Sequence, residues 1–205
     1  FNVILRIIIN ERGVFLITIA LAGNPNCGKT TIFNALTGSN QHVGNWPGVT
    51  VEKKEGICKV EGQQFNIVDL PGTYSLGAYS EDEVVARDFI LKEKPDLVIN
   101  VVDASNIERN LYLTTQLLEM KANVIIALNM MDEAEKAGIQ IDIASLSKQL
   151  KVPVVSTVAS RNKGIQELKM KFCEVLSNNG PSKPEQISFG GEIDAAVESL
   201  EREIK

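Results

Sequence analysis

The chain has 205 residues, a formal net charge of −5 and 44% hydrophobic residues, which suits one sizeable folded domain with an appendage. Its acidic balance, without a Lys/Arg cluster, argues against a nucleic-acid partner, because phosphate backbones are bound by basic patches. The cysteines Cys27, Cys58 and Cys173 share no metal-ligand spacing, and the single histidine, His42, argues against histidine-rich metal sites and against Ser–His or Cys–His catalysis.

The apolar stretch at the start of the chain predicts neither a membrane span nor a signal peptide. Residues 1–9 are apolar apart from Asn2 and Arg6, and residues 10–13 end the run far short of the roughly 20 apolar residues that cross a bilayer. No small-residue cleavage pattern follows. We expect residues 1–15 to be a leader, either an addition to the native chain or an extra edge strand, and the domain to begin near Leu16.

A complete phosphate-binding motif follows the first strand-like run. Residues 16–22 are apolar and β-branched, which predicts a buried strand, and residues 31–36 predict a helix. Between them the pattern G-x-x-x-x-G-K-[ST] is matched by Gly23-Asn24-Pro25-Asn26-Cys27-Gly28-Lys29-Thr30. This context favours a phosphate loop over a plain glycine turn, because backbone N–H groups at a helix N-terminus converge on a phosphate. We expect Lys29 to reach the β- and γ-phosphates and Thr30 to bind Mg²⁺. The expected nucleotide contacts are Asn24, Pro25, Asn26, Cys27, Gly28, Lys29, Thr30 and Thr31.

A polar stretch and a hairpin separate this motif from a second one. Residues 37–49 are polar and Gly-rich, which predicts a long loop, and a loop of this length is usually functional or disordered. Residues 50–60 and 63–68 predict two strands of a hairpin. The second strand leads to Asp69-Leu70-Pro71-Gly72. In a P-loop protein this position holds Mg²⁺ through water and presents a glycine N–H to the γ-phosphate.

The rest of the sequence alternates between helix and strand patterns. A capping box at Ser80–Glu83 predicts a helix to Glu93. Strands are then predicted at 96–102, 123–128 and 152–155, helices at 106–121, 143–150 and 163–176, and a loop at 156–162. This alternation predicts an α/β fold with a mostly parallel, doubly wound sheet and helices on both faces. Ligands of such sheets bind beyond the C-terminal ends of the strands, where the predicted motifs gather.

The identity of the base depends on Asn129-Met130-Met131-Asp132, at the end of a predicted strand. The Asp132 carboxylate can accept hydrogen bonds from both N1–H and the exocyclic amine of guanine, a donor pair that adenine lacks. The Ala159 N–H, within Val158-Ala159-Ser160, is expected to meet the guanine O6. The common GTPase motif has Lys where this chain has Met130. We expect that change to weaken affinity without reversing the preference for guanine.

Four segments resemble the cytosolic G domain of the ferrous iron transport protein B family. They are residues 23–30, Val43-Gly44-Asn45-Trp46-Pro47-Gly48-Val49-Thr50-Val51-Glu52, Asp69-Leu70-Pro71-Gly72-Thr73-Tyr74-Ser75-Leu76 and Asn129-Met130-Met131-Asp132. The first is generic, whereas the Asn-Trp-Pro-Gly-Val-Thr-Val-Glu run and the Asn-Met-Met-Asp variant are more particular to the family. The resemblance spans residues 16–176. It implies a P-loop GTPase domain at residues 16–178 that converts GTP and water to GDP and phosphate at a slow intrinsic rate.

The resemblance also implies two switch segments. The predicted loop becomes switch I, with Thr50 as the second protein ligand to Mg²⁺, and residues 69–80 become switch II. The role of Trp46 is left open: the side chain could pack on a partner or on the nucleotide, or it could shape the loop. Cys27 is expected to be a small space-filling residue rather than a redox switch. The expected switch contacts with the nucleotide are Gly48, Val49, Thr50, Asp69, Pro71 and Gly72.

The predicted catalytic groups include a monovalent cation. Thr73 stands where many small GTPases place a water-orienting Gln. The chain resembles GTPases that lack this Gln and use K⁺, which Asn26 would help to hold. The alternative is that Asn26 only shapes the loop. The residues expected to act in hydrolysis are Asn26, Lys29, Thr50 and Gly72, with Mg²⁺ on Thr30, Thr50 and Asp69 and K⁺ on Asn26.

The C-terminal part is expected to lie outside the G domain. Residues 177–186 have the composition of a linker, and residues 192–205 predict an amphipathic helix. Residues 179–205 resemble the linker and the truncated start of the family's helical spacer domain. The resemblance implies a place on the cytoplasmic face of the inner membrane. Expected partners are the permease of the same transporter and the rest of the spacer, with self-association left open.

Two other functions fit the same motifs. A soluble, K⁺-dependent GTPase of tRNA modification or ribosome assembly would share the phosphate loop and the missing Gln. Such proteins usually carry basic RNA-binding appendages, whereas this chain is acidic. A module that senses GTP and GDP by binding a partner, with negligible turnover, is the other alternative.

Overall fold

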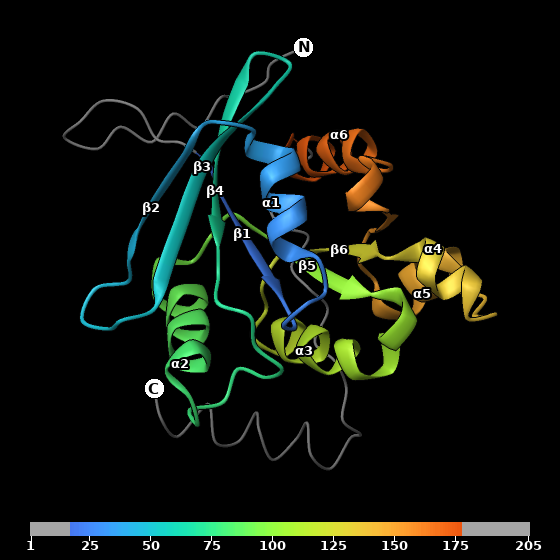
Figure 1. Cartoon of the computed structure of the whole chain (residues 1–205), viewed down its shortest axis with the longest axis horizontal. Helices are drawn as coiled ribbons and strands as arrows, with labels where there is room; N and C mark the ends of the chain where they lie inside the picture. The colour runs from blue at the N-terminus through green and yellow to red at the C-terminus, as the bar shows by residue number, and fades with distance from the viewer. Residues whose placement is uncertain (1–16, 178–205) are drawn as a thin grey trace, which may run out of the picture.

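The computed structural model describes residues 17–177, which form one seven-stranded sheet in the order β2-β3-β4-β1-β5-β6-β7 (Figure 1). The strands are β1 (Ile17–Gly23), β2 (Gln41–Asn45), β3 (Glu52–Val60), β4 (Gln63–Asp69), β5 (Leu97–Asp103), β6 (Val124–Asn129) and β7 (Val154–Ser156). Strand β1 is central and pairs in parallel with β4 and β5, and β6 and β7 continue the parallel part. Strands β2 and β3 are antiparallel additions at one edge. The predicted mostly parallel sheet is confirmed.

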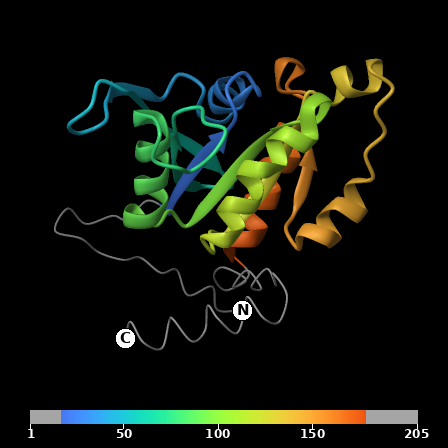
Figure 2. The same cartoon turned by 90° about the horizontal axis from the view of Figure 1, so that it is seen from below.

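Helices cover both faces of the sheet, as a doubly wound fold requires. They are α1 (Lys29–Thr37), α2 (Glu81–Asp88), α3 (Ile107–Glu119), α4 (Met131–Lys136), α5 (Ile143–Leu150) and α6 (Ile165–Ser177). Helix α2 continues as a π-helical turn, η1 (Phe89–Glu93), and short 3₁₀ turns occur at η2 (Ala104–Asn106) and η3 (Ala159–Arg161). Helix α2 lies toward the β2 end of the sheet, whereas α4 and α5 lie toward the β7 end (Figures 1 and 2).

The core is divided by the sheet into two apolar layers. All six residues of β6 are buried, which explains its unbroken apolar run, because a parallel strand is covered on both faces. One layer joins α1 and α6 to the sheet, and in it the Phe65 and Phe172 rings meet edge-on with centroids 5.0 Å apart. The other joins α2, η1 and α3 to the opposite face. These layers fix the strand ends that carry the predicted motifs.

One local prediction was wrong, and one short helix was missed. Residues 37–49 are not one loop, because Gln41–Asn45 forms β2 and pairs with β3. All five β2 side chains are exposed, so the strand is made by backbone pairing and leaves no apolar alternation in the sequence. The helix predicted to about Glu93 is confirmed, as α-helix to Asp88 and as a π-helical turn from Phe89 to Glu93. Helix α4 was not predicted, since six residues are too few to show a helical period.

Several boundaries are confirmed, with shifts of one or two residues at strand ends. Helix α5 spans the predicted residues 143–150, and the Ser80 hydroxyl caps α2 by accepting from the Glu83 N–H at 3.2 Å. The Glu83 carboxylate does not complete a capping box, because it binds elsewhere. The predicted leader at residues 1–15 and the predicted helix at 192–205 lie outside the described residues.

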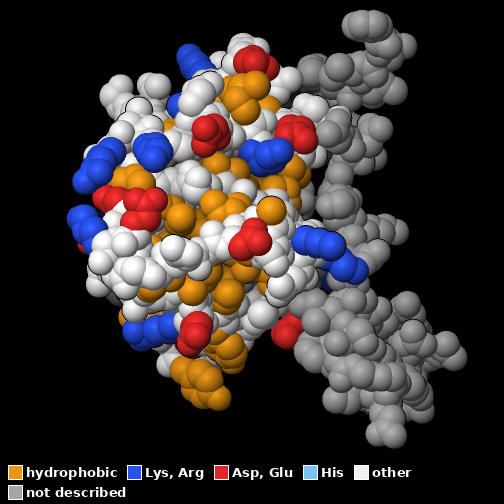
Figure 3. Space-filling model, turned by 90° about the vertical axis from the view of Figure 1, so that its right-hand side faces the viewer, with side chains coloured by type: hydrophobic (Ala, Val, Ile, Leu, Met, Phe, Trp, Pro, Cys, Tyr) orange, Lys and Arg blue, Asp and Glu red, His pale blue; other side chains and the backbone are white. Residues whose placement is uncertain are grey.

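The surface that carries α4, α5 and α6 mixes both signs of charge. Lys and Arg side chains alternate there with Asp and Glu, with small apolar areas between them (Figure 3). Within residues 17–177, no helix combines the length and apolar character that a membrane span requires.

Candidate functional site: a nucleotide pocket at the ends of β1, β4 and β6

The phosphate loop joins β1 to α1 in a conformation that requires glycine at two points. Gly28 caps α1 with φ at 87°, and a Cβ there would lie 2.3 Å from Asn129 Nδ2. A Cβ on Gly23 would lie 2.7 Å from the Val101 carbonyl oxygen. Asn26 also has a positive φ of 65°, and its side chain is exposed at the loop. The loop therefore opens the helix N-terminus toward a ligand, as a phosphate site needs.

Lys29 and Asp69 form a buried ion pair at the centre of the site. Lys29 begins α1, Asp69 ends β4, and their side chains are 10% and 7% exposed. Burial raises the pKa of the Asp69 carboxyl above its ordinary value, and the neighbouring Lys29 ammonium partly opposes that rise. Asp69 with the exposed Thr30 hydroxyl gives the oxygen ligands that Mg²⁺ prefers, so the residues fit that ion.

The segment after β4 lies against the phosphate loop. The Leu70 N–H donates to the Leu21 carbonyl at 3.0 Å, and the Thr73 N–H donates to the Gly23 carbonyl at 3.2 Å. A Cβ on Gly72 would lie 3.3 Å from Pro25 Cα. Pro71 and Gly72 therefore lie beside the phosphate loop. This is the position in which Gly72 is predicted to contact the γ-phosphate.

Asn129 joins three segments at the far end of the pocket. This buried side chain donates from Nδ2 to the Cys27 carbonyl at 3.0 Å. Its Oδ1 accepts from the Ala159 N–H at 3.0 Å and from the Thr157 hydroxyl at 3.1 Å. Asn129 therefore braces the phosphate loop against the loop after β7. The Ala159 N–H, predicted to meet a guanine O6, is engaged by Asn129 in this structure.

A hollow of about 190 Å³ adjoins this brace. It is lined by Gly28, Thr31, Asn129, Met130, Asp132, Glu133, Val158, Ala159 and Ser160. The Asp132 carboxylate lies 3.4 Å from Arg161 Nη2. Met130, at the position of the usual Lys, adopts a left-handed conformation with φ at 60° and begins α4. The structure thus brings together the predicted base-binding residues from three distant segments.

The predicted switch I residues Gly48, Val49 and Thr50 lie in the connection from β2 to β3 (Figure 1). This connection enters β3 at the end of the sheet where Lys54 pairs with Asp69. Trp46 shapes this connection, because it is buried and its ring meets Phe89 edge-on with centroids 5.3 Å apart. Its packing partner belongs to η1. The role of Thr50 as a Mg²⁺ ligand stays a prediction.

Sequence reasoning missed three residues of the pocket. Glu133 lines the hollow, Thr157 binds Asn129, and Arg161 pairs with Asp132. Thr157 could have been predicted from the sequence, because it is a polar residue at the end of a strand, as Asp69 and Asn129 are. Glu133 and Arg161 could not, because their positions depend on α4 and η3.

A phosphate loop on a central parallel strand, an Asp at the end of β4 and an Asn-x-x-Asp pocket after β6 together define the G domain of a P-loop GTPase. A sequence model of the family described as ferrous iron transport protein B matches residues 17–172. The chain belongs to the ferrous iron transport protein B family.

Its relatives are much longer proteins. The chain is 57% identical over 166 residues to the Fe(2+) transporter FeoB of Escherichia coli K12, covering 79% of this chain and 22% of the relative. It is 49% identical over 191 residues to an Fe(2+) transport protein A/Fe(2+) transporter FeoB fusion protein of Porphyromonas gingivalis, covering 92% and 23%. The chain thus spans less than a quarter of the length of these curated relatives.

Solved structures show the same domain. The cytosolic domain of the T. maritima FeoB iron transporter in its GMPPNP form is 47% identical, with a TM-score of 0.85 over 91% of this chain and 73% of that chain. A GDP form of the same domain has a TM-score of 0.85 over 92% and 73%, at 47% identity. The FeoB G-domain from Methanococcus jannaschii is 54% identical, with a TM-score of 0.71 over 78% and 97%.

Proposed function

We propose that residues 16–178 are the GTP-binding and GTP-hydrolysing regulatory domain of a ferrous iron transporter, on the cytoplasmic face of the inner membrane. The permease and the helical spacer that residues 179–205 would begin are its partners. The observation that carries the proposal is the Asn129 brace, which joins the phosphate loop to a hollow suited to a base. The solved GDP and GMPPNP forms of a FeoB cytosolic domain support nucleotide binding.

The nucleotide would lie along the phosphate loop, with its phosphates near Asp69 and its base near Asp132. Backbone N–H groups of Asn24 and of residues 26–31 bind the phosphates, and Lys29 exchanges Asp69 for the β- and γ-phosphates. Asp132 leaves Arg161 and accepts from the guanine N1–H and amine. The Ala159 N–H is then shared between Asn129 and the guanine O6, a three-centre arrangement that is common in proteins.

Hydrolysis requires charge stabilisation around the γ-phosphate. Mg²⁺ would neutralise phosphate charge and would be held by Thr30 and Asp69, with Thr50 after switch I moves from the sheet edge. K⁺ would add positive charge at the transition state, and the exposed Asn26 side chain is placed to help hold it. The Gly72 N–H donates to the γ-phosphate, and the switches are expected to relax when it leaves.

The test is single-turnover GTP hydrolysis in KCl and in NaCl. We expect K⁺ to accelerate the wild-type chain and to have no such effect on Asn26→Ala. Asn40→Ala, at an exposed position after α1, is the control and should keep the acceleration. Equal slow rates in both salts for the wild type would refute the K⁺ mechanism and favour the GTP/GDP-sensing alternative.

Base recognition has a separate test. Asp132→Asn replaces an acceptor by a group that also donates, which suits the second carbonyl of xanthine better than the guanine amine. We expect GTP affinity to fall at least about tenfold and xanthosine triphosphate affinity to rise. Unchanged GTP affinity in a competition titration would remove Asp132 from the base site.

A further inference from the structure

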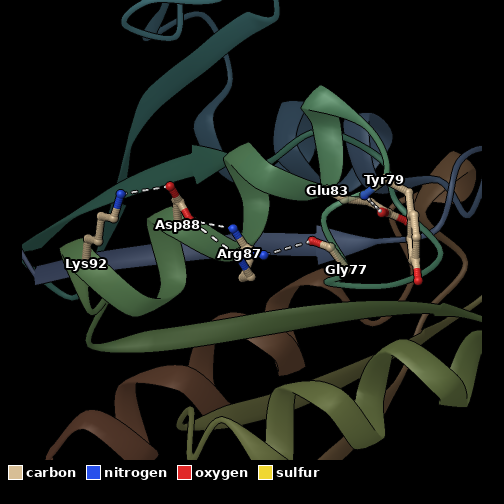
Figure 4. Close-up of polar contacts among 6 residues, drawn as sticks. All are labelled: Gly77, Tyr79, Glu83, Arg87, Asp88 and Lys92. Atoms are coloured by element: carbon tan, nitrogen blue, oxygen red, sulfur yellow. Dashed lines mark hydrogen bonds and ion pairs between the residues drawn. The ribbon is translucent and has the colours of Figure 1, made fainter.

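Beyond Thr73, which still binds the phosphate loop, residues 75–79 are bound by α2. The Glu83 carboxylate accepts from the Ser75 hydroxyl at 2.7 Å and from the Tyr79 N–H at 3.1 Å. Arg87 Nη1 donates to the Gly77 carbonyl at 3.3 Å (Figure 4). Two charged side chains on one helix therefore fix the path of residues 75–79 in this structure.

Helix α3 binds the same segment from the other side. The Leu76 N–H donates to Gln116 Oε1 at 2.8 Å, and the Arg109 guanidinium lies 4.0 Å from the centroid of the Tyr74 ring. Gln116 and Arg109 are both on α3. The segment thus has hydrogen-bond partners on two helices, which define one position for it.

Asn24 lies in the phosphate loop with its amide unused. Its side chain is 3% exposed, and among the described residues neither Nδ2 nor Oδ1 has a hydrogen-bond partner. A buried amide with no partner is unfavourable, and such groups are rare in native proteins. Its chain neighbours Gly23 and Pro25 are the residues that Thr73 and Gly72 contact. The unused amide is therefore next to the segment that α2 and α3 bind.

We propose that Asn24 is a positioning residue that binds the backbone of residues 71–76 when GTP occupies the site. This inference rests on the proposed function, in which the γ-phosphate draws the Gly72 N–H toward the loop. Leu76 then leaves Gln116, and the Asn24 amide supplies a donor and an acceptor to the arriving backbone. The unpaired amide destabilises the position of residues 71–76 seen in this structure. It therefore favours the GTP-bound position, in which the amide is paired.

The test compares affinities for GDP and for the non-hydrolysable GTP analogue GMPPNP. Asn24→Leu removes the amide at similar volume, so we expect the ratio of the GMPPNP to the GDP dissociation constant to rise about tenfold. The melting temperature without nucleotide should rise, because a buried unpaired group is removed. Gln116→Leu, which removes the competing acceptor, should lower the ratio. Asn66→Leu, half-buried in the middle of β4, is the matched control and should leave it within twofold of the wild type.

An unchanged ratio in Asn24→Leu, or equal weakening of both nucleotides, would overturn the proposal. Failure of the wild-type chain to bind either nucleotide would instead refute the proposed function, and it is visible before any variant is made. Hydrogen exchange of the wild-type chain gives an independent test if Asn24→Leu does not fold. The Leu76 amide should exchange faster with GMPPNP than with GDP, and equal protection would overturn the proposal.

Discussion

Asn129 joins the phosphate loop to the loop after β7 through one buried side chain. Sequence reasoning assigned it to the base, whereas the structure uses its amide to bind the Cys27 carbonyl, the Thr157 hydroxyl and the Ala159 N–H. The close approach of Gly28 leaves no room for any side chain between this amide and the loop. The shape of the pocket and the stability of the domain therefore depend on the same buried group.

Asn129→Ala is expected to destabilise the domain by about 3 kcal/mol, because three hydrogen bonds are lost and buried groups are left unpaired. Urea unfolding without nucleotide measures this loss. Asn123→Ala, which removes one bond from Nδ2 to the Asp96 carbonyl, should cost about 1 kcal/mol or less. Similar losses in the two variants would mean that Asn129 is not a brace.

At the scale of elements, the connection between β2 and β3 is attached to the helix that follows switch II. The Trp46 ring contacts Phe89 of η1 and lies 5.0 Å below Lys53 Nζ. Both predicted switch segments thus reach the α2–η1 helix, one by an aromatic contact and the other by Glu83 and Arg87. In the proposed function, a movement of switch I toward the phosphates would break the aromatic contact.

The fluorescence of Trp46, the only tryptophan in the chain, should report that movement. We expect emission from a buried indole without nucleotide and with GDP, and a shift to longer wavelength with Mg²⁺ and GMPPNP. Phe89→Ala should show the longer wavelength without nucleotide. Identical wild-type spectra in all three states would contradict an attached switch I.

The contacts of Glu83 predict a pH dependence for switch II. The Ser75 hydroxyl, followed by the Tyr79 N–H, lowers the pKa of Glu83 from its ordinary 4.5. A group whose pKa is lowered on folding stabilises the fold above the unfolded pKa, and this contribution is lost as pH falls through the folded pKa. Glu83→Gln should therefore be less stable than wild type at pH 7, with the gap closing well below pH 4.5. A constant difference in melting temperature across this range would contradict the assignment.

At the scale of the whole molecule, the central sheet was predictable because β1, β5 and β6 are apolar on both faces and the motifs follow their ends. Strand β2 was not, since its exposed residues carry no pattern. Asp69, Asn129 and Ser160 were expected to lie together, because the C-terminal ends of parallel strands are on the same side of a sheet. The hydrogen bond from Asn129 to the Cys27 carbonyl and the Asp132–Arg161 ion pair were not predictable, because both depend on tertiary packing.

The three cysteines give a measure of the integrity of the whole domain. Burial is the main cause that raises the pKa of Cys27 and of Cys173 to about 11, and burial also raises the pKa of Cys58. Because the thiolate is the reactive form, all three should resist iodoacetamide at pH 8 in the folded protein. Unfolding in urea should expose all three to rapid modification. Rapid labelling of the native protein, measured by mass spectrometry, would contradict this packing.

The central place of β1 has a consequence for synthesis. Ile17 pairs with Phe65 and Ile19 with Leu97, so the first described strand is completed only after β4 and β5 have been made. At roughly 5–20 residues per second, translation from β1 to the end of β5 takes on the order of ten seconds. During that interval β1 lacks at least one of its two neighbouring strands in the nascent chain. The first of these strands to be synthesised is therefore completed in the sheet only after later strands have been made. The middle of the sheet is accordingly the part of this domain that most needs protection from aggregation at the ribosome.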